Sequence, residues 1–179
     1  MNTIILKRGF TLIELLITIL VLVIVMTIAI PSFRSIIQNN LTISASNDMI
    51  ISLNFARSEA IKRAANVSLC PAADQTFSSC GTDWNQGWII FLNPAVASNY
   101  SSGNSAQLLL RTQSFSGSTP NITTSPSTSL ANYNSAGFAG TNTSNLTFNI
   151  AATGCSGPYA RSLNISMTGR VTVTKSNCP

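Results

Sequence analysis

An apolar run from Phe10 to Ile30 constrains the fold of this chain more than any other feature of its sequence, and the run holds a single charge, Glu14. A helix of that length can cross the roughly 30 Å hydrocarbon core of a membrane. The basic pair Lys7-Arg8 precedes the run and is expected to stay in the cytoplasm, which places the chain after Pro31 on the far side of the membrane. A cleavable secretory signal has a shorter apolar region that ends in a small-residue cleavage site, and this run has neither property.

Glu14 is unusual in such a helix, because a carboxylate inside a membrane is costly and commonly has both a partner and a function. The residues around it, Lys7-Arg8-Gly9 followed by Phe10-Thr11-Leu12-Ile13-Glu14, resemble the processing and assembly motif of type IV pilins and type II secretion pseudopilins. The resemblance implies that a prepilin peptidase cuts after Gly9 and methylates the new N-terminal residue, Phe10. It also implies that Glu14 pairs with the N-terminal amine of a neighbouring subunit and that Pro31 is the family's helix proline.

The segment 31–65 is predicted to continue this helix outward. Its apolar residues recur every three or four positions, and neither Pro nor Gly interrupts it after Pro31. Glu59 and Arg63 stand at i and i+4 in the favourable orientation, which predicts a charged helix turn near the sheet.

Part of this segment, Asn54–Arg63, resembles the ARSEAIKR signature of the GspH/FimT branch, the minor pilins and pseudopilins. Two later stretches are similar to the same branch: Gly87–Phe91 to one of its strands, and Tyr133–Gly137 to its Asn/Ser-rich turn before a strand.

After the helix, short β-like runs alternate with turn residues. Between Asn93 and Asn145 the composition is mostly Ser, Thr, Asn, Gly and Ala, which predicts long polar loops. The expected architecture is α+β, with the type IV pilin fold that the resemblance implies: a long N-terminal helix, membrane-spanning in its first half, packed on an antiparallel β-sheet head. The expected segments are a leader peptide (1–9), a transmembrane and assembly helix (10–30), its amphipathic continuation (31–65) and a β-rich extracytoplasmic head (66–179). The strand candidates are Val67–Leu69, Trp88–Leu92, Gln107–Gln113, Leu146–Ile150, Ser162–Met167 and Val171–Thr174.

Four cysteines beyond the apolar run, an even count, predict disulfides in an oxidising compartment. Three pairings are possible. Loop closure favours local pairing, of Cys70 with Cys80 and of Cys155 with Cys178. A zinc site is not expected, because the sequence has no Cys-x-x-Cys spacing and no His.

Near the C-terminus, apolar residues alternate in Leu163–Met167 and again in Val171–Val173. Keeping both sets on one face places Met167 opposite Val171 and leaves Thr168-Gly169-Arg170 as a three-residue hairpin loop. Arg170 then lies at an exposed tip, and a Cys155–Cys178 bond would fasten the two flanks of the hairpin. An alternative β-bulge would move Arg170 to a face of the sheet.

From Trp84 to Pro179 the sequence contains basic side chains but no Asp or Glu. Such a region can bind phosphate backbones in a salt-sensitive, sequence-tolerant way, and the same charges also suit an ordinary solvated surface. FimT-type minor pilins implicated in DNA uptake carry a C-terminal Gly-Arg-x-Arg motif. Gly169-Arg170-Val171 resembles its first half, with Thr172 where the second Arg would stand. The hypothesis of non-sequence-specific binding to double-stranded DNA involves Arg111, Arg161, Arg170 and Lys175.

The composition excludes several other classes. With 45% hydrophobic and 8% charged residues, the chain does not have the composition of a disordered protein. The sequence contains no His and only five acidic residues, so His-based catalysis is excluded and a carboxylate metal cage is not expected. No enzymatic activity, metal or cofactor is predicted.

The resemblance implies a minor pilin that acts in pilus initiation or at the pilus tip. Its partners would be other major and minor pilins and the prepilin peptidase. It would be a single-pass inner-membrane protein with a periplasmic head before assembly and part of the surface pilus afterwards. The alternative is a type II secretion minor pseudopilin with a purely structural tip role.

Overall fold

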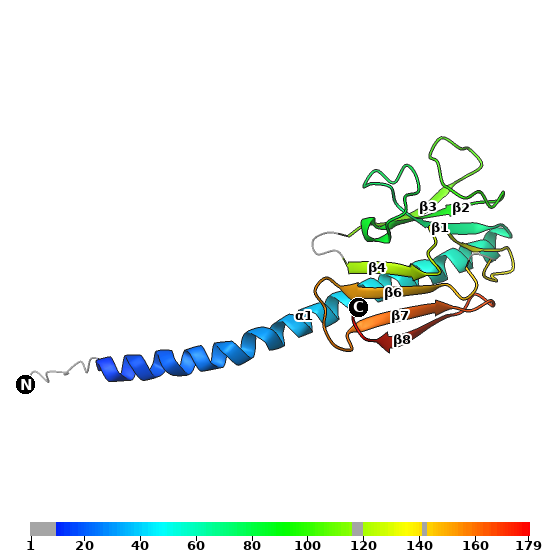
Figure 1. Ribbon diagram of the computed structural model, residues 1–179. Coiled ribbons are helices and arrows are strands. Elements are labelled where there is room, and N and C mark those ends of the chain that lie inside the picture. Colours follow the sequence, from blue (N-terminus) through cyan, green and yellow to red (C-terminus); the bar gives the residue numbers. More distant parts are fainter. Residues whose placement is uncertain (1–9, 116–119, 141–142) are drawn as a thin grey trace, which may run out of the picture. The chain divides into compact units, whose positions relative to one another are not determined.

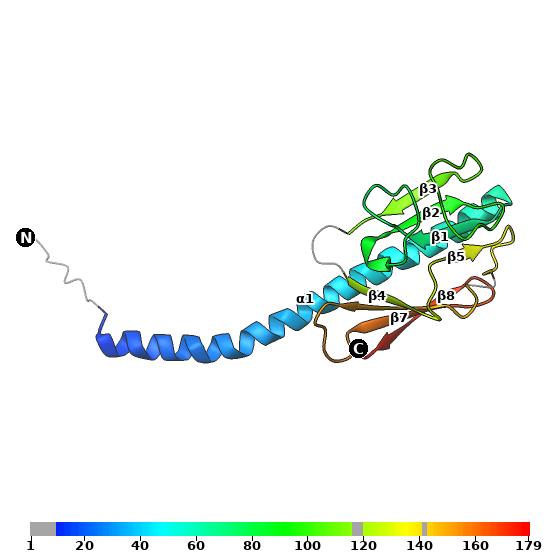
Figure 2. The same ribbon diagram turned by 45° about the horizontal axis from the view of Figure 1, so that its top comes forward.

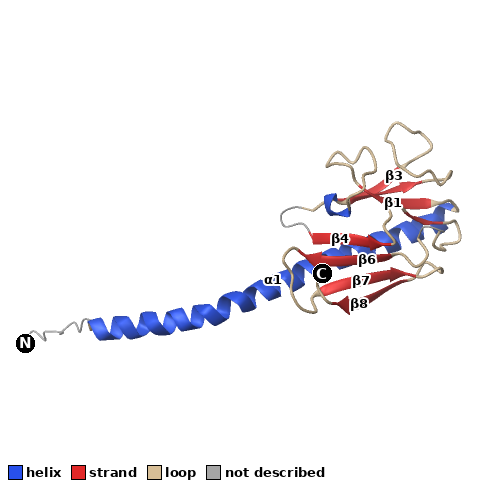
Figure 3. Cartoon of the chain, viewed as in Figure 1, coloured by secondary structure: helices blue, strands red, loops and turns tan. Residues whose placement is uncertain are grey.

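The computed structural model describes residues 10–115, 120–140 and 143–179. The predicted leader 1–9, with the processing residue Gly9, lies outside them. Within the described residues the chain forms one long helix, α1 (Leu12–Arg63), a short 3₁₀ helix, η1 (Trp84–Gln86), and eight strands (Figures 1 and 3). The strands are β1 (Val67–Pro71), β2 (Trp88–Leu92), β3 (Leu109–Gln113), β4 (Pro120–Ser125), β5 (Ala131–Tyr133), β6 (Thr147–Ala152), β7 (Ala160–Ile165) and β8 (Val171–Ser176).

The chain divides into two units, Met1–Ile37 and Gln38–Pro179. In the first unit the hydroxyls of Thr18 and Thr27 donate to carbonyl oxygens three residues earlier in α1, which satisfies these two polar side chains within an apolar helix. Among the described residues, α1 is the one helix long and apolar enough to span a membrane, with a mean hydropathy of 3.0 over its most apolar window.

In the second unit, α1 is amphipathic as the sequence predicted. One stripe, spaced by three or four residues, is buried against the sheets. It consists of Ala45, Met49, Leu53, Ala56 and Ala60. The helix ends at Arg63, slightly before the predicted end near Ala65, because Ala64 adopts a left-handed conformation with φ of 50°.

Two four-stranded sheets pack against this part of α1 (Figures 1 and 2), which confirms the predicted antiparallel β-sheet head. Their strand orders are β3-β2-β1-β5 and β4-β6-β7-β8, and all neighbouring strands are antiparallel. The prediction of long polar loops between Asn93 and Asn145 is wrong at β4 and β5, which are strands. Both strands are weakly patterned, and they form because β6 and β1 offer them backbone partners.

A hydrophobic core is shared by α1 and both sheets. Between the sheets, the ring of Trp84 meets that of Phe148 edge-on at 4.9 Å, and the Trp84 indole N–H donates to the carbonyl oxygen of Thr128 at 3.0 Å. On the other face of β2, Phe91 packs with Tyr100 from the following loop at 5.1 Å between ring centroids. This second cluster explains why β1 and β2 are buried on both faces.

The β7–β8 hairpin differs in register from the prediction. Ile165 pairs with Val171, and Met167 lies in the loop with 67% of its surface exposed. The loop closes through a hydrogen bond from the Ser166 N–H to the Arg170 carbonyl oxygen at 2.9 Å, and Gly169 has a φ of 77°. The register is therefore set by the turn geometry that Gly169 permits. Apolar alternation alone predicted a different register.

Two disulfides join Cys70 to Cys80 and Cys155 to Cys178, with Cα–Cα distances of 5.7 and 5.8 Å. This is the local pairing that the sequence favoured. The second bond links the segment before β7 to the segment after β8, so it closes the open end of the hairpin.

Candidate functional site

The N-terminal end of α1 carries the predicted assembly residues. Phe10 lies just before the helix with 79% of its surface exposed, and Glu14 lies in the first turn, where its backbone N–H donates to the Thr11 hydroxyl. Every ion pair between described residues involves Glu59, so none reaches Glu14. Pro31 lies inside α1, which continues through it.

At the C-terminal end of α1, Arg57 joins two loops that are distant in sequence. Its Nε donates to the carbonyl oxygen of Gly137 at 2.9 Å, and its Nη2 donates to that of Thr168 at 3.0 Å. The N–H of Ala139 also donates to the Met167 carbonyl oxygen at 3.1 Å. We call the surface formed by Arg57, the turn 134–138 and the loop 166–170 the loop end.

The loop end is closely packed. A Cβ on Gly169 would collide with the carbonyl oxygen of Gly137, and it would also lie 3.2 Å from the Tyr133 ring. Tyr133 is buried, and its hydroxyl has no hydrogen-bond partner among the described residues. This burial raises the pKa of Tyr133 well above its ordinary value of 10.0.

The Glu59–Arg63 ion pair predicted from the sequence is present, with Arg63 Nε donating to Glu59 Oε2 at 2.6 Å. Lys62 lies 3.7 Å from the other carboxylate oxygen. The Arg63 hydrogen bond lowers the pKa of Glu59. The bridging role of Arg57 was not predicted, because its partners lie 80 and 111 residues away and no local spacing signals them.

The four predicted DNA-binding residues do not form one patch. Arg161 and Lys175 are directly opposite each other on β7 and β8. Arg170 is exposed in the loop at the other end of β8. Arg111 lies on β3 of the other sheet, with its guanidinium 5.6 Å from the centroid of the Phe55 ring.

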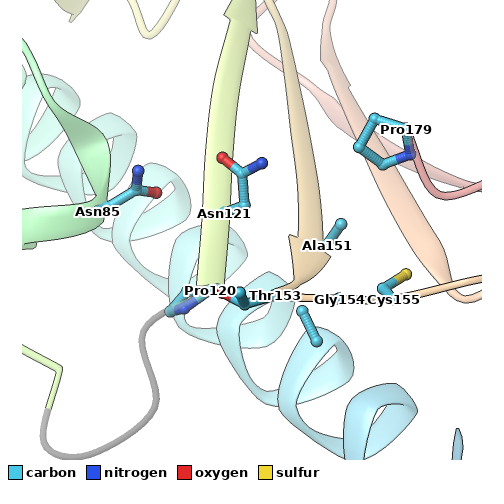
Figure 4. A pocket seen from close by; sticks show the side chains of 9 residues that line it. Asn85, Pro120, Asn121, Ala151, Thr153, Gly154, Cys155 and Pro179 are labelled. Atoms are coloured by element: carbon cyan, nitrogen blue, oxygen red, sulfur yellow. The ribbon is translucent and has the colours of Figure 1, made fainter.

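A cavity of about 360 Å³ lies where β4 begins and β6 ends (Figure 4). Its lining includes the amides of Asn85 and Asn121 but no charged side chain. The Asn85 side-chain oxygen already accepts a hydrogen bond from the Ile122 N–H at 2.6 Å, and Cys155 is disulfide-bonded. The lining side chains therefore offer no acid, base or free nucleophile.

Comparison with known families decides the identity of the chain. Residues 45–169 match the model of the type II transport protein GspH, and residues 6–30 match the prokaryotic N-terminal methylation motif. The chain belongs to the GspH family. The GspH match includes the loop end up to Gly169, and the methylation match includes Gly9, Phe10 and Glu14.

Two crystal structures of the type IV minor pilin FimU from Pseudomonas aeruginosa share the fold of this GspH-family chain. The first covers 75% of this chain and 89% of FimU, at 24% identity and a TM-score of 0.57. The second covers 73% and 90%, at 24% identity and a TM-score of 0.53. This confirms the predicted type IV pilin fold, a long N-terminal helix packed on antiparallel sheets. No curated protein matches the chain.

Proposed function

We propose that this GspH-family chain is a minor pilin that enters a type IV pilus through α1, in pilus initiation or at the tip. The observation that carries the proposal is Glu14, an exposed carboxylate in the first turn of a helix of membrane-spanning length. The match of residues 6–30 to the methylation motif supports cleavage after Gly9 by a prepilin peptidase and methylation of Phe10.

In this mechanism the chain first resides in the inner membrane, with its head in the periplasm, where disulfides form readily. Another major or minor pilin then docks beside it. The N-terminal amine of one subunit neutralises Glu14 of its neighbour, which favours a single register because an unpaired carboxylate in lipid is costly. The head contributes to assembly through its shape and its surface. We propose no enzymatic activity and no cofactor for it.

The test is a Glu14→Val variant expressed in cells that lack the wild-type chain. We expect the variant to be cleaved and methylated normally, as mass spectrometry would show, but to be missing from sheared pili. Asp48→Asn, which removes another carboxylate of the same helix, is the matched control and should be incorporated. Normal incorporation of Glu14→Val would overturn the proposal.

The matched family is described as a type II transport protein, so the second candidate is a minor pseudopilin with a structural tip role. Both candidates would assemble in the same way, through α1 and Glu14. Deleting the gene separates them: loss of surface pili with normal protein secretion supports the pilin, and the reverse supports the pseudopilin.

DNA capture is a further part of the pilin proposal. The region after Asp83 has four basic and no acidic side chains, and Arg170 is exposed at the loop end. We expect the full chain in detergent to bind double-stranded DNA without sequence preference, more weakly as salt rises. Arg170→Gln should weaken binding more than Arg111→Gln, because Arg111 lies on the other sheet beside the Phe55 ring. No binding at low salt would leave a purely structural subunit.

A further inference from the structure

Arg161 and Lys175 form an unusual pair of neighbours. They are direct partners in the β7–β8 register, and like charges placed opposite each other destabilise a sheet. No carboxylate compensates them: within the described residues, ion pairs reach only Lys62 and Arg63. The acidic residues of the sequence all stand at or before Asp83. Two opposed cations that lack a counter-ion among the described residues can bind an anion from outside the chain.

The pair faces α1 at one defined end of the second unit. Arg161 shares its strand face with the buried Leu163, and its Nη2 donates to the Asn39 side-chain oxygen at 3.3 Å. The neighbouring Gln38 donates to the Gly154 carbonyl oxygen at 2.9 Å. Tyr159, partly exposed, stands just before β7 at the same end. We call Tyr159, Arg161 and Lys175 the basic corner.

Chain connectivity limits how far the basic corner can lie from the end of the apolar run. Asn39 follows Ile30, the last residue of the apolar run, by nine positions of one continuous helix, which corresponds to about 14 Å along its axis. The headgroup layer extends about 5 to 8 Å beyond the hydrocarbon, and the long stems of Arg and Lys can reach across the remainder. Tyr side chains are enriched at membrane–water interfaces.

We propose that the basic corner binds the phosphate groups of anionic lipids on the periplasmic face of the inner membrane and so orients the head before assembly. The proposal rests on the proposed function only for the membrane residence of the chain. A lipid is favoured over DNA because the two cations lie at the Asn39 end of the head. The loop end, with Arg170, lies at the opposite end of β8.

Lysine acylation can test the proposal, because the sequence contains three lysines, one of them in the basic corner. The full chain is placed in vesicles of phosphatidylethanolamine with phosphatidylglycerol, or of phosphatidylcholine alone, and treated with a membrane-impermeant acylating reagent. Mass spectrometry gives the rate at Lys175 relative to Lys62, whose side chain is 76% exposed near the C-terminal end of α1. We expect the ratio to fall about fivefold in the anionic vesicles.

Arg161→Gln should largely remove this protection, and the matched control Arg111→Gln, in the other sheet, should retain it. Circular dichroism and a thermal midpoint like that of the wild type show that the variants are folded. Equal ratios in the two kinds of vesicle overturn the proposal. Protection of Lys175 by inorganic phosphate alone in phosphatidylcholine vesicles also overturns it. So does protection of Lys175 by duplex DNA when anionic lipid gives no protection. These readouts require no pilus, so their failure is distinct from failure of Glu14-dependent incorporation.

Discussion

The hydroxyl oxygen of Thr42 on α1 accepts a hydrogen bond of 3.0 Å from the backbone N–H of Ala152, the last residue of β6. The same hydroxyl donates to the Gln38 carbonyl oxygen at 3.0 Å. Both Thr42 and Ala152 are buried, so one helix side chain provides the partner that a buried strand terminus needs. Thr42 thereby ties α1 to the sheet β4-β6-β7-β8.

Replacing Thr42 with Val should destabilise the protein by about 2 kcal/mol, because the shape is kept while the buried Ala152 N–H loses its acceptor. Thr42→Ser should recover most of that loss. Chemical denaturation of the three proteins in detergent measures the difference. Equal midpoints for Thr42→Val and wild type would show that another group accepts this hydrogen bond.

Arg57→Ala should cost about 2 kcal/mol, since it removes charged hydrogen bonds to the carbonyl oxygens of Gly137 and Thr168. Arg111→Ala, which removes a cation from an exposed aromatic contact, should cost less than about 1 kcal/mol. Amide hydrogen exchange should localise the Arg57 effect to the loop end. A uniform increase in exchange over the whole head would contradict a local bridging role.

Gly169→Ala should destabilise the hairpin by more than about 2 kcal/mol, because the position has a φ of 77° and a Cβ would collide with the Gly137 carbonyl oxygen. Gly103→Ala is the matched control: its Cβ would lie 4.0 Å from the nearest atom outside its neighbours, and a change below about 0.5 kcal/mol is expected. Thermal unfolding of both variants is the measurement.

Tyr133→Phe should change stability little at pH 7, where the unpartnered hydroxyl is neutral, and should improve it above pH 10. Burial raises the pKa of Tyr133 in the folded protein, so the unfolded chain loses this proton first as the pH rises past 10.0. The contribution of Tyr133 to stability is therefore fully present below pH 10 and declines above it, by about 1.4 kcal/mol per pH unit at most. Denaturation at pH 8 and pH 11 tests this, and an identical decline in the variant would assign the effect to other groups.

The sequence predicted the elements that have a strong pattern of their own. Trp88–Leu92 is a strand with the predicted bounds, and the buried stripe from Ala45 to Ala60 follows the helical period. β4 was missed because its Asn, Thr and Ser side chains carry no apolar alternation; backbone pairing with β6 decides its structure.

The candidate site was predicted less completely than the fold. The motif around Glu14 is local, so its residues can be read in order along the chain. The loop end instead depends on Arg57 reaching carbonyl oxygens in two distant loops, and backbone acceptors have no sequence signature. The hairpin register failed for a related reason: Met167 fits the apolar alternation, but the turn at Gly169 removes it from the sheet.

The Cys155–Cys178 bond also determines how the protein responds to mechanical load. It closes a covalent ring over a sequence separation of 23, and this ring contains the whole β7–β8 hairpin. When the chain is pulled from its ends, the ring cannot lengthen, so about 80 Å of contour length stays hidden even after the surrounding sheet has yielded. A subunit under tension from a moving filament would thus keep its last hairpin intact while the bond remains oxidised.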